Sequence, residues 1–459
     1  MLFSSIEFIF GFLPVVTIVY FALAKRYGSL TRIWLLVASL FFYGWWNPSN
    51  IFLILGSMVF NYFVGKAIAH SRNRWQLILG IAANLGVLFY YKYVDFFLSN
   101  VNSLAGTDIA LLHIVLPLGI SFFTFQQIAY LVDNFEGMVR DYKFHEYGLF
   151  VSFFPQLVAG PIVHHSELMP QFENKSNRLI DYNNLAKGLF IFNCGLAKKI
   201  IVADTFSVIV NNGYGNIEFL STLGAWVTSL AYSIQLYFDF SGYSDMAIGL
   251  GLIFNIQIPV NFNSPYRAKD IQDFWRRWHI TLSRFLRDYL YIPLGGNRRS
   301  EVITSRNLLV TFVLGGIWHG AGWTFVFWGF MHGAALVIYR YFSKVKIMLP
   351  KWIAIAITFT FVNITWVFFR SPSWHAATEM IRKMVIFSGG DSQFALVNDY
   401  YSFPIWIGAV ILLFSKNTNE LAAEFSFSRS TYIKFIILLV LNILFLNSIS
   451  NQEFLYFDF

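Results

Sequence analysis

The stretch that decides the fold runs from residue 274 to residue 333 and has two halves of opposite character. Its first half reads FWRRWHITLSRFLRDYLYIPLGGNRR (274–299), and its second half contains LLVTFVLGGIWHGAGWTFVFWGFMHG (308–333). The first half is rich in arginine, whereas the quoted second half has no charged residue and two titratable ones, His319 and His332. Ionisable groups at membrane depth are by default candidates for function. His319 is therefore a candidate for a functional site.

The composition of the whole chain indicates a membrane protein with several crossings. Of its 459 residues, 56% are hydrophobic and only 13% are charged, against about 25% charged in soluble domains. The single cysteine, Cys194, excludes an intramolecular disulfide and disfavours a thiolate metal site. The net charge of +8 fits basic cytoplasmic loops better than nucleic-acid binding. We therefore expect membrane lipid, and no nucleic acid, as a partner.

Apolar runs of roughly 20 residues predict the membrane crossings. The first run, 2–23, is expected to be a retained span, because no basic region precedes it and no small-residue cleavage site follows it. Basic clusters at 25–32 and 70–74 fall on one side, which the positive-inside rule makes cytoplasmic. Continuing along the chain predicts one all-α integral-membrane domain over 1–459, with roughly eleven crossings and both termini extracytoplasmic.

One segment does not fit a regular crossing. The run FFPQLVAGPIVHH (153–165) contains Pro155 and Pro161 within a length too short to span cleanly. Irregular backbone survives at membrane depth only where protein or a water-filled cavity satisfies its polar groups. The run therefore predicts a re-entrant or broken segment beside an internal cavity.

Four arginines in the first half of the deciding stretch predict a cationic face. If residues 273–290 form one helix, these arginines fall within about a quarter to a third of a turn, opposite an aromatic and aliphatic face. They are Arg276, Arg277, Arg284 and Arg287. Guanidinium groups match the geometry of phosphates. The face can bind lipid phosphates as an interfacial helix, or a phosphate-bearing donor at the mouth of a cavity, or both.

His319 lies within GGIWHGAGW (315–323), between pairs of glycines. Small residues allow a neighbouring helix or a thin acyl chain to approach closely, and an imidazole exchanges a proton near neutral pH. This setting predicts a general base for acyl transfer. The alternative is a histidine that is hydrogen-bonded inside the helix bundle and only fixes packing. His332, which follows thirteen residues later, is expected to point elsewhere and to pack.

Two carboxylates, Asp239 and Asp245, lie in the otherwise apolar run FDFSGYSDM (238–246). Buried carboxylates need partners, and we expect the arginines to supply them in a structural network. No two histidines stand at a ligand-like spacing beside a carboxylate, so no metal site is predicted. A proton-coupled transporter with His319 and Asp239 in a proton path is the alternative of a different class. The lack of an internal sequence repeat counts against it.

Four motifs resemble those of membrane-bound O-acyltransferases. They are SLFFYGWWNP (39–48), FPQLVAGPI (154–162), NFNSPYRAKDIQDFWRRWHITLSRFLRDYLYIPLGGNR (261–298) and GIWHGAGWTFVFWG (316–329). The chain is similar in particular to the bacterial branch that contains the membrane subunits of alginate and peptidoglycan O-acetylation and the teichoic acid D-alanyl transferase. The resemblance implies a helical fold around a central funnel, with His319 as the catalytic histidine and His279 as the second motif histidine.

The resemblance also implies a reaction. An acetyl group would come from a cytoplasmic thioester, acetyl-CoA, without a bound cofactor, and the arginine face with Trp318 would bind this donor. The group would cross the bacterial cytoplasmic (inner) membrane to an extracytoplasmic SGNH-type acetyltransferase partner that modifies peptidoglycan or alginate. Related systems carry an FxYF-like tail, which FLYF (454–457) resembles, so Tyr456 is a candidate acyl relay. D-alanyl transfer to teichoic acid stays an alternative within the same enzyme class.

Overall fold

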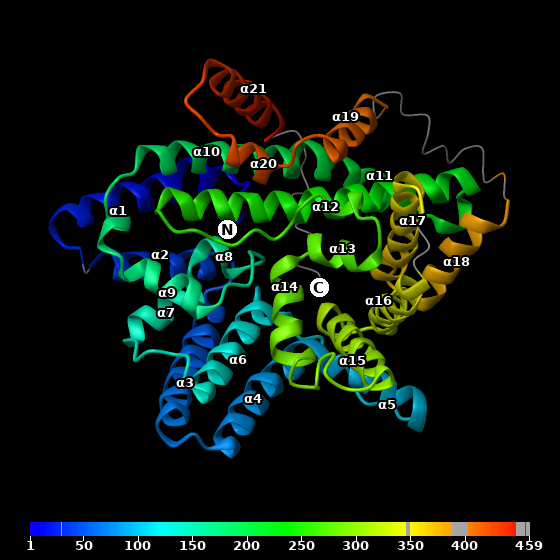
Figure 1. The fold of residues 1–459 in the computed structure, drawn as a ribbon, viewed down its shortest axis with the longest axis horizontal. Coiled ribbons are helices and arrows are strands. Elements are labelled where there is room, and N and C mark those ends of the chain that lie inside the picture. Colours follow the sequence, from blue (N-terminus) through cyan, green and yellow to red (C-terminus); the bar gives the residue numbers. More distant parts are fainter. Residues whose placement is uncertain (29, 346–348, 388, 390–402, 447–454, 456–459) are drawn as a thin grey trace. The chain divides into compact units, whose positions relative to one another are not determined.

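Helices account for every regular element that the structure describes, which confirms the all-α prediction. The computed structural model describes residues 1–28, 30–345, 349–387, 389, 403–446 and 455, and no β-strand occurs among them (Figure 1). The first ten α-helices are α1 Leu13–Arg26, α2 Leu30–Gly44, α3 Ser49–Ser71, α4 Arg74–Leu88, α5 Val94–Ala105, α6 Ile120–Glu136, α7 Phe144–Ser152, α8 Phe154–Leu157, α9 His165–Glu173 and α10 Tyr182–Ala197.

The remaining helices carry most of the predicted site. They are α11 Asp204–Gly215, α12 Thr222–Ile253, α13 Ile271–Arg277, α14 Ile280–Leu286, α15 Glu301–His319, α16 Trp323–Phe342, α17 Lys351–Arg370, α18 Trp374–Val385, α19 Phe403–Phe414, α20 Thr418–Ala423 and α21 Arg429–Phe445. Short π-helical and 3₁₀ turns lie between some of these helices.

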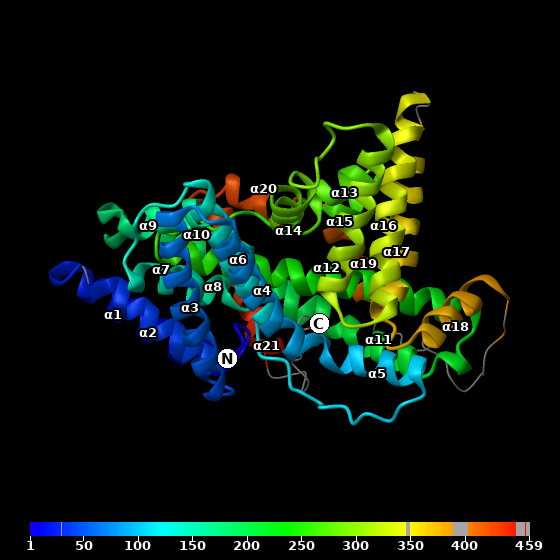
Figure 2. The ribbon, with the colours of Figure 1, turned by 90° about the horizontal axis from the view of Figure 1, so that it is seen from below.

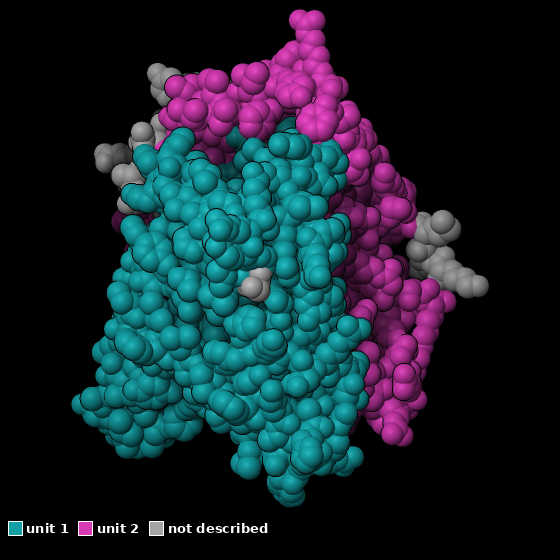
Figure 3. Space-filling view, turned by 90° about the vertical axis from the view of Figure 1, so that its left-hand side faces the viewer, with its two compact units in different colours: residues 1–193, 243–259 teal, residues 194–242, 260–459 magenta. Residues whose placement is uncertain are grey.

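The chain divides into two compact units, which Figure 3 colours separately. The first comprises Met1–Asn193 and Tyr243–Pro259, and the second comprises Cys194–Gly242 and Val260–Phe459. Helix α12 contributes to both, because the boundary falls after Gly242. The prediction of a single domain over 1–459 stays a prediction.

Several helices are long and apolar enough to cross a membrane, as expected of a protein with several crossings. By length and composition, four helical stretches of the described chain meet this condition: Glu7–Arg26, Ser49–Ser71, Arg74–Ala105 and Lys351–Arg370. A shorter apolar helix covers Leu30–Gly44. The first predicted span thus corresponds to a helix of membrane length. The total of roughly eleven crossings stays a prediction.

The proline-containing segment of the first unit is broken, as predicted. Helix α7 ends at Ser152, the chain turns at Phe153, and the four-residue helix α8 follows. Residues 146–163 are buried without exception. Surrounding protein therefore shields this irregular backbone, which is the condition for such a segment at membrane depth.

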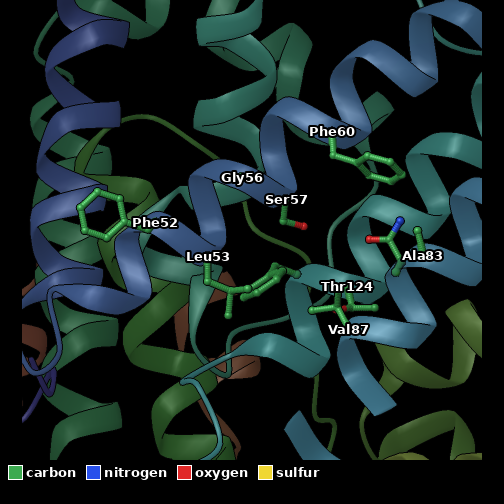
Figure 4. Close-up of a pocket in the computed structure, with 10 residues that line it drawn as sticks. Phe52, Leu53, Gly56, Ser57, Phe60, Ala83, Val87 and Thr124 are labelled. Atoms are coloured by element: carbon green, nitrogen blue, oxygen red, sulfur yellow. The ribbon is translucent and has the colours of Figure 1, made fainter. Parts of the chain in front are cut away.

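An open pocket of about 320 Å³ lies in the first unit, between helices α3, α4 and α6. Figure 4 shows Phe52, Leu53 and Phe60 of α3 on its wall together with Val87 of α4. The lining is mostly apolar, and its polar members are Ser57, Asn84 and Thr124. None of the predicted site residues lines this pocket.

In the second unit, helices α15, α16 and α17 run side by side (Figures 1 and 2). Glycine allows the first two to touch through their backbones. A Cβ atom on Gly316 would collide with the carbonyl oxygen of Phe325, and one on Gly329 would collide with that of Phe312. Gly316, three residues before His319, therefore allows the close approach of a neighbouring helix. The approach of an acyl chain, the other use predicted for these small residues, stays a prediction.

Candidate active site

The helix is interrupted at His279, between α13 and α14. The prediction of a single helix over 273–290 is therefore wrong. His279 has a φ of 43°, a left-handed conformation that is uncommon for residues other than glycine. The amide of Ile280 donates to the carbonyl oxygen of Asn261 at 2.9 Å instead of continuing the α13 helix. The first amides of α14 thus take their acceptors from Asn261, which ends one helix and starts the next.

This break separates the four arginines into two pairs. Arg276 and Arg277 close α13, while Arg284 lies in α14 and Arg287 opens the π-helical turn Arg287–Tyr291. The prediction that all four arginines lie on one face of a continuous helix is therefore wrong. Phosphate binding by these side chains stays a prediction.

Two of the arginines form local ion pairs. Arg277 Nε donates to Asp273 Oδ1 at 2.8 Å, and its Nη1 donates to the carbonyl oxygen of Asn263 at 3.2 Å. Arg287 Nε donates to Asp288 Oδ1 at 2.7 Å while its side chain stays 61% exposed. Arg277 therefore holds the loop before α13, whereas Arg287 keeps a surface position.

His279 is completely buried, and its ring is fixed on several sides. Its Nδ1 lies 3.2 Å from Asn261 Oδ1. The ring of Phe240 meets it edge-on, with centroids 4.8 Å apart, and the ring of Trp318 lies at 6.5 Å. The backbone break and this packing together set the direction of the imidazole.

His319 is the last residue of α15 and lies in a cage of aromatic rings. The centroid of its ring is 4.9 Å from Trp318, 5.1 Å from Trp328 and 5.2 Å from Phe369. Trp318 contacts both histidines, so it connects His279 to His319. The structure thus brings together three predicted site residues, and it buries all three.

His332 uses both ring nitrogens inside the protein. Trp275 Nε1 donates to its Nδ1 at 3.2 Å, and its Nε2 lies 3.0 Å from Thr365 Oγ1. Thr365 Oγ1 in turn donates to the carbonyl oxygen of Val362 at 2.7 Å. This chain of bonds joins α13, α16 and α17, which agrees with the packing role predicted for His332.

Sequence reasoning missed the partner of Asp239. Lys199 Nζ lies 2.7 Å from Asp239 Oδ1 and 2.6 Å from Asp204 Oδ1, and all three side chains are nearly inaccessible to solvent. The partner expected from the arginine block is thus a lysine. The available signal was Lys199 itself, a charge inside an otherwise apolar run. Asp245 is buried on the part of α12 that belongs to the first unit.

One described residue near the C-terminus, Leu455, contacts the same carboxylate. The amide of Leu455 donates to Asp239 Oδ2 at 3.2 Å. The proposed relay residue Tyr456 lies outside the described residues, as do its neighbours Phe454 and Phe457. Within the described ranges, no three His, Cys, Asp or Glu side chains gather as a metal ion would need, and a site without metal stays a prediction.

Comparison with known proteins defines the class. The pattern of the MBOAT, membrane-bound O-acyltransferase family matches residues 134–372, slightly more than half of the chain. The matched region includes His279 and His319 and the helices that position them. The chain belongs to the membrane-bound O-acyltransferase family, and it is an acyltransferase.

Three named relatives align with most or about half of the chain. The peptidoglycan O-acetyltransferase of Helicobacter pylori (strain ATCC 700392 / 26695) is 45% identical over 100% of this chain and 98% of its own length. The probable alginate O-acetylase AlgI of Pseudomonas aeruginosa is 40% identical over 90% of this chain and 80% of its own. The teichoic acid D-alanyltransferase of Bacillus subtilis (strain 168) is 28% identical over 56% of this chain and 69% of its own.

Proposed function

We propose that this protein takes an acetyl group from acetyl-CoA on the cytoplasmic side and passes it across the cytoplasmic membrane for O-acetylation of an envelope polysaccharide. One observation carries the proposal: two buried histidines, His279 and His319, meet through Trp318 in an acyltransferase fold. Identity of 45% over the whole chain to a peptidoglycan O-acetyltransferase favours peptidoglycan as the polysaccharide. Alginate is the second choice, because the alginate O-acetylase relative covers 90% of the chain at 40% identity.

In the proposed mechanism His319 is the general base. It takes the proton of an acceptor hydroxyl, whose oxygen attacks the carbonyl carbon of the thioester. The C–S bond breaks, and the leaving thiolate takes the proton back from the imidazolium. The aromatic cage around His319 supports this role, because it excludes water that would hydrolyse the thioester. His279 is the second catalytic histidine and contacts the reacting groups.

Donor binding is assigned to Trp318 and the four arginines. A guanidinium group pairs with phosphate oxygens through two parallel hydrogen bonds, and acetyl-CoA carries several phosphates. Arg276 is exposed at the end of α13, only three residues before His279. This short separation along the chain supports a path from a phosphate contact to the buried ring.

The acceptor hydroxyl is assigned to Tyr456, from which an extracytoplasmic SGNH-type acetyltransferase partner would take the acetyl group. The contact between the Leu455 amide and Asp239 supports this assignment, because it holds the residue next to Tyr456 against a buried cluster of the same unit. The topology that goes with it places both termini outside. Replacing Tyr456 by Phe removes the acceptor oxygen and should abolish polysaccharide acetylation in cells, while unchanged acetylation would exclude a covalent relay through this residue.

The proposed function is tested with purified protein in lipid vesicles that contain acetyl-CoA. We expect the wild type to release CoA thiol in the presence of an acceptor and His319→Ala to release none, while both unfold at the same temperature. In cells, mass spectrometry of the envelope polysaccharides should find O-acetyl groups only with the wild type. Acetylation by a folded His319→Ala protein would refute the assignment of the base.

The same assay separates the other functions. Cleavage of a D-alanyl thioester on a carrier protein, without cleavage of acetyl-CoA, would place the protein with the teichoic acid D-alanyltransferases. Proton-coupled uptake of a solute without any thioester cleavage would make it a transporter.

A further inference from the structure

Asn261, the first residue of the motif over 261–298, lies at the centre of the break between α13 and α14, and the sequence predicted no role for it. It is completely buried, and its side-chain Oδ1 has three neighbours. His279 Nδ1 lies at 3.2 Å, Thr281 Oγ1 at 2.9 Å and the backbone nitrogen of Thr281 at 3.2 Å. A single oxygen therefore fixes both the first turn of α14 and the imidazole ring.

The backbone amide of Thr281 decides which way the Asn261 carboxamide points. An amide N–H only donates, so the atom that faces it is the carboxamide oxygen and not the nitrogen. That oxygen only accepts, and hence the ring nitrogen beside it, His279 Nδ1, carries the proton. In a neutral imidazole with its proton on Nδ1, the other nitrogen, Nε2, bears the lone pair. The arrangement around Asn261 thus selects one of the two tautomers.

We propose that Asn261 is a positioning residue for acyl transfer: it holds neutral His279 as the Nδ1–H tautomer, so that Nε2 presents a lone pair to an N–H or O–H group of the substrate. This inference rests on the proposed function and specifies whether His279 donates or accepts a hydrogen bond toward the substrate. A neutral His279 in this tautomer accepts hydrogen bonds at Nε2 and does not donate one to the carbonyl oxygen of the thioester.

The loop that carries Asn261 is itself held from two sides. On one side, the amide of Asn263 donates to the carbonyl oxygen of Arg277 at 2.9 Å. On the other side, Asn417, the N-cap of α20, donates from Nδ2 to Asn263 Oδ1 at 2.9 Å. Asn419 in α20 donates from Nδ2 to the carbonyl oxygen of Phe262 at 2.7 Å. Asn261 is therefore a fixed acceptor, and an orienting partner needs to be fixed to select a tautomer.

The opposite arrangement at His332 shows that the tautomer is set by each histidine's own partner. There, an obligate donor, the indole N–H of Trp275, faces Nδ1. Nδ1 must accept, and the proton lies on Nε2. The predicted ring state of His279 therefore follows from Asn261 and not from burial, which the two histidines share.

The direct test is ¹⁵N NMR of wild-type protein labelled in its histidines, with the His279 signals assigned by their loss in His279→Gln. We expect a protonated Nδ1 and a non-protonated Nε2. The variant Asn261→Leu keeps the approximate shape but removes the acceptor. It should lose the fixed tautomer and reduce acetyl transfer by about 10- to 100-fold, the range found for partners that orient a metal-bound imidazole.

Two further variants distinguish positioning from simple structural support. Asn261→Asp keeps an oxygen beside Nδ1 and should restore both the Nδ1–H signal and most of the transfer rate lost in Asn261→Leu. Thr281→Val removes only the hydroxyl that also contacts Oδ1, and it should leave the His279 tautomer unchanged even if the protein melts earlier.

The inference is wrong if wild-type His279 carries its proton on Nε2, and this measurement decides even if Asn261→Leu does not fold. It is also wrong if Asn261→Leu keeps the tautomer while losing transfer. Failure of the proposed function looks different: the wild type would show the expected tautomer and cleave no acetyl thioester.

Discussion

His279 and His332 occupy equivalent environments by burial, since neither exposes any surface, but their ring nitrogens are used in opposite ways. Both ring nitrogens of His332 form hydrogen bonds, one with Trp275 and one with Thr365, and these bonds connect three helices. His279 meets Asn261 through Nδ1 and lies against the tryptophan that also contacts His319. Burial alone therefore does not distinguish the two histidines: the partners of His332 join helices, whereas His279 lies against the ring that also contacts the proposed base.

The surroundings of His332 and of the proposed base, His319, also have one side chain in common, Trp328. The indole of Trp328 lies 5.1 Å from the His319 ring and 4.8 Å from the His332 ring, centroid to centroid. The His332 network thus fixes a ring of the aromatic cage that surrounds the proposed base. Removing His332 should affect catalysis only through the stability of that cage, whereas removing His279 should affect the reaction itself.

The largest expected effect is that of His279→Gln. If His279 takes part in the reaction, its loss should lower the rate of acetyl transfer by about 10²- to 10⁴-fold, the usual contribution of an acid–base group. The measurement is release of CoA thiol from acetyl-CoA by purified protein, with His332→Gln as the matched control in the same unit. Similar rate losses in the two folded variants would break the distinction between the two histidines.

The second effect concerns stability and uses the charged cluster of the same unit. Lys199→Met would leave Asp204 and Asp239 buried side by side without their cation. Breaking one side of a buried ion pair costs about 3–5 kcal/mol, so the variant should unfold at a clearly lower temperature in detergent. The double variant Lys199→Met/Asp239→Asn should recover part of this loss. A melting temperature equal to that of the wild type would show that the cluster is not a structural network.

The third effect is the smaller one expected at His332. His332→Leu leaves the indole N–H of Trp275 and the hydroxyl of Thr365 buried without this partner. An unsatisfied buried donor costs about 1–3 kcal/mol, so the variant should melt earlier than the wild type but later than Lys199→Met. The rate per folded molecule should stay close to that of the wild type. A loss of 100-fold in the folded variant would place His332 in the catalytic machinery.

The all-α fold, the membrane-length helices and the broken segment at Phe153 could be predicted from the sequence, because each depends on local composition or on prolines. The arrangement at His279 could not. Residues 273–290 have the periodicity of one helix, and the break arises from Asn261, which lies outside that window and supplies acceptors to the α14 amides. For the same reason the sequence did not identify Lys199 as the partner of Asp239, since forty residues of chain separate them.

The smallest effect is expected at the exposed ion pairs of Glu301, which, unlike the buried histidines, are accessible to solvent. Glu301 begins α15 and lies 2.8 Å from Arg340 Nε and 3.0 Å from Lys344 Nζ, with 45% of its side chain exposed. The Arg340 guanidinium, followed by the Lys344 ammonium, lowers the pKa of Glu301 from 4.5 to about 2. Since the folded-state pKa is the lower one, the pair stabilises the protein fully above pH 4.5 and loses this contribution as the pH falls through 2.

The difference in melting temperature between the wild type and Glu301→Gln should therefore be small at pH 7, shrink with added salt and shrink further below pH 4.5. A difference that grows on acidification would contradict the ion pair.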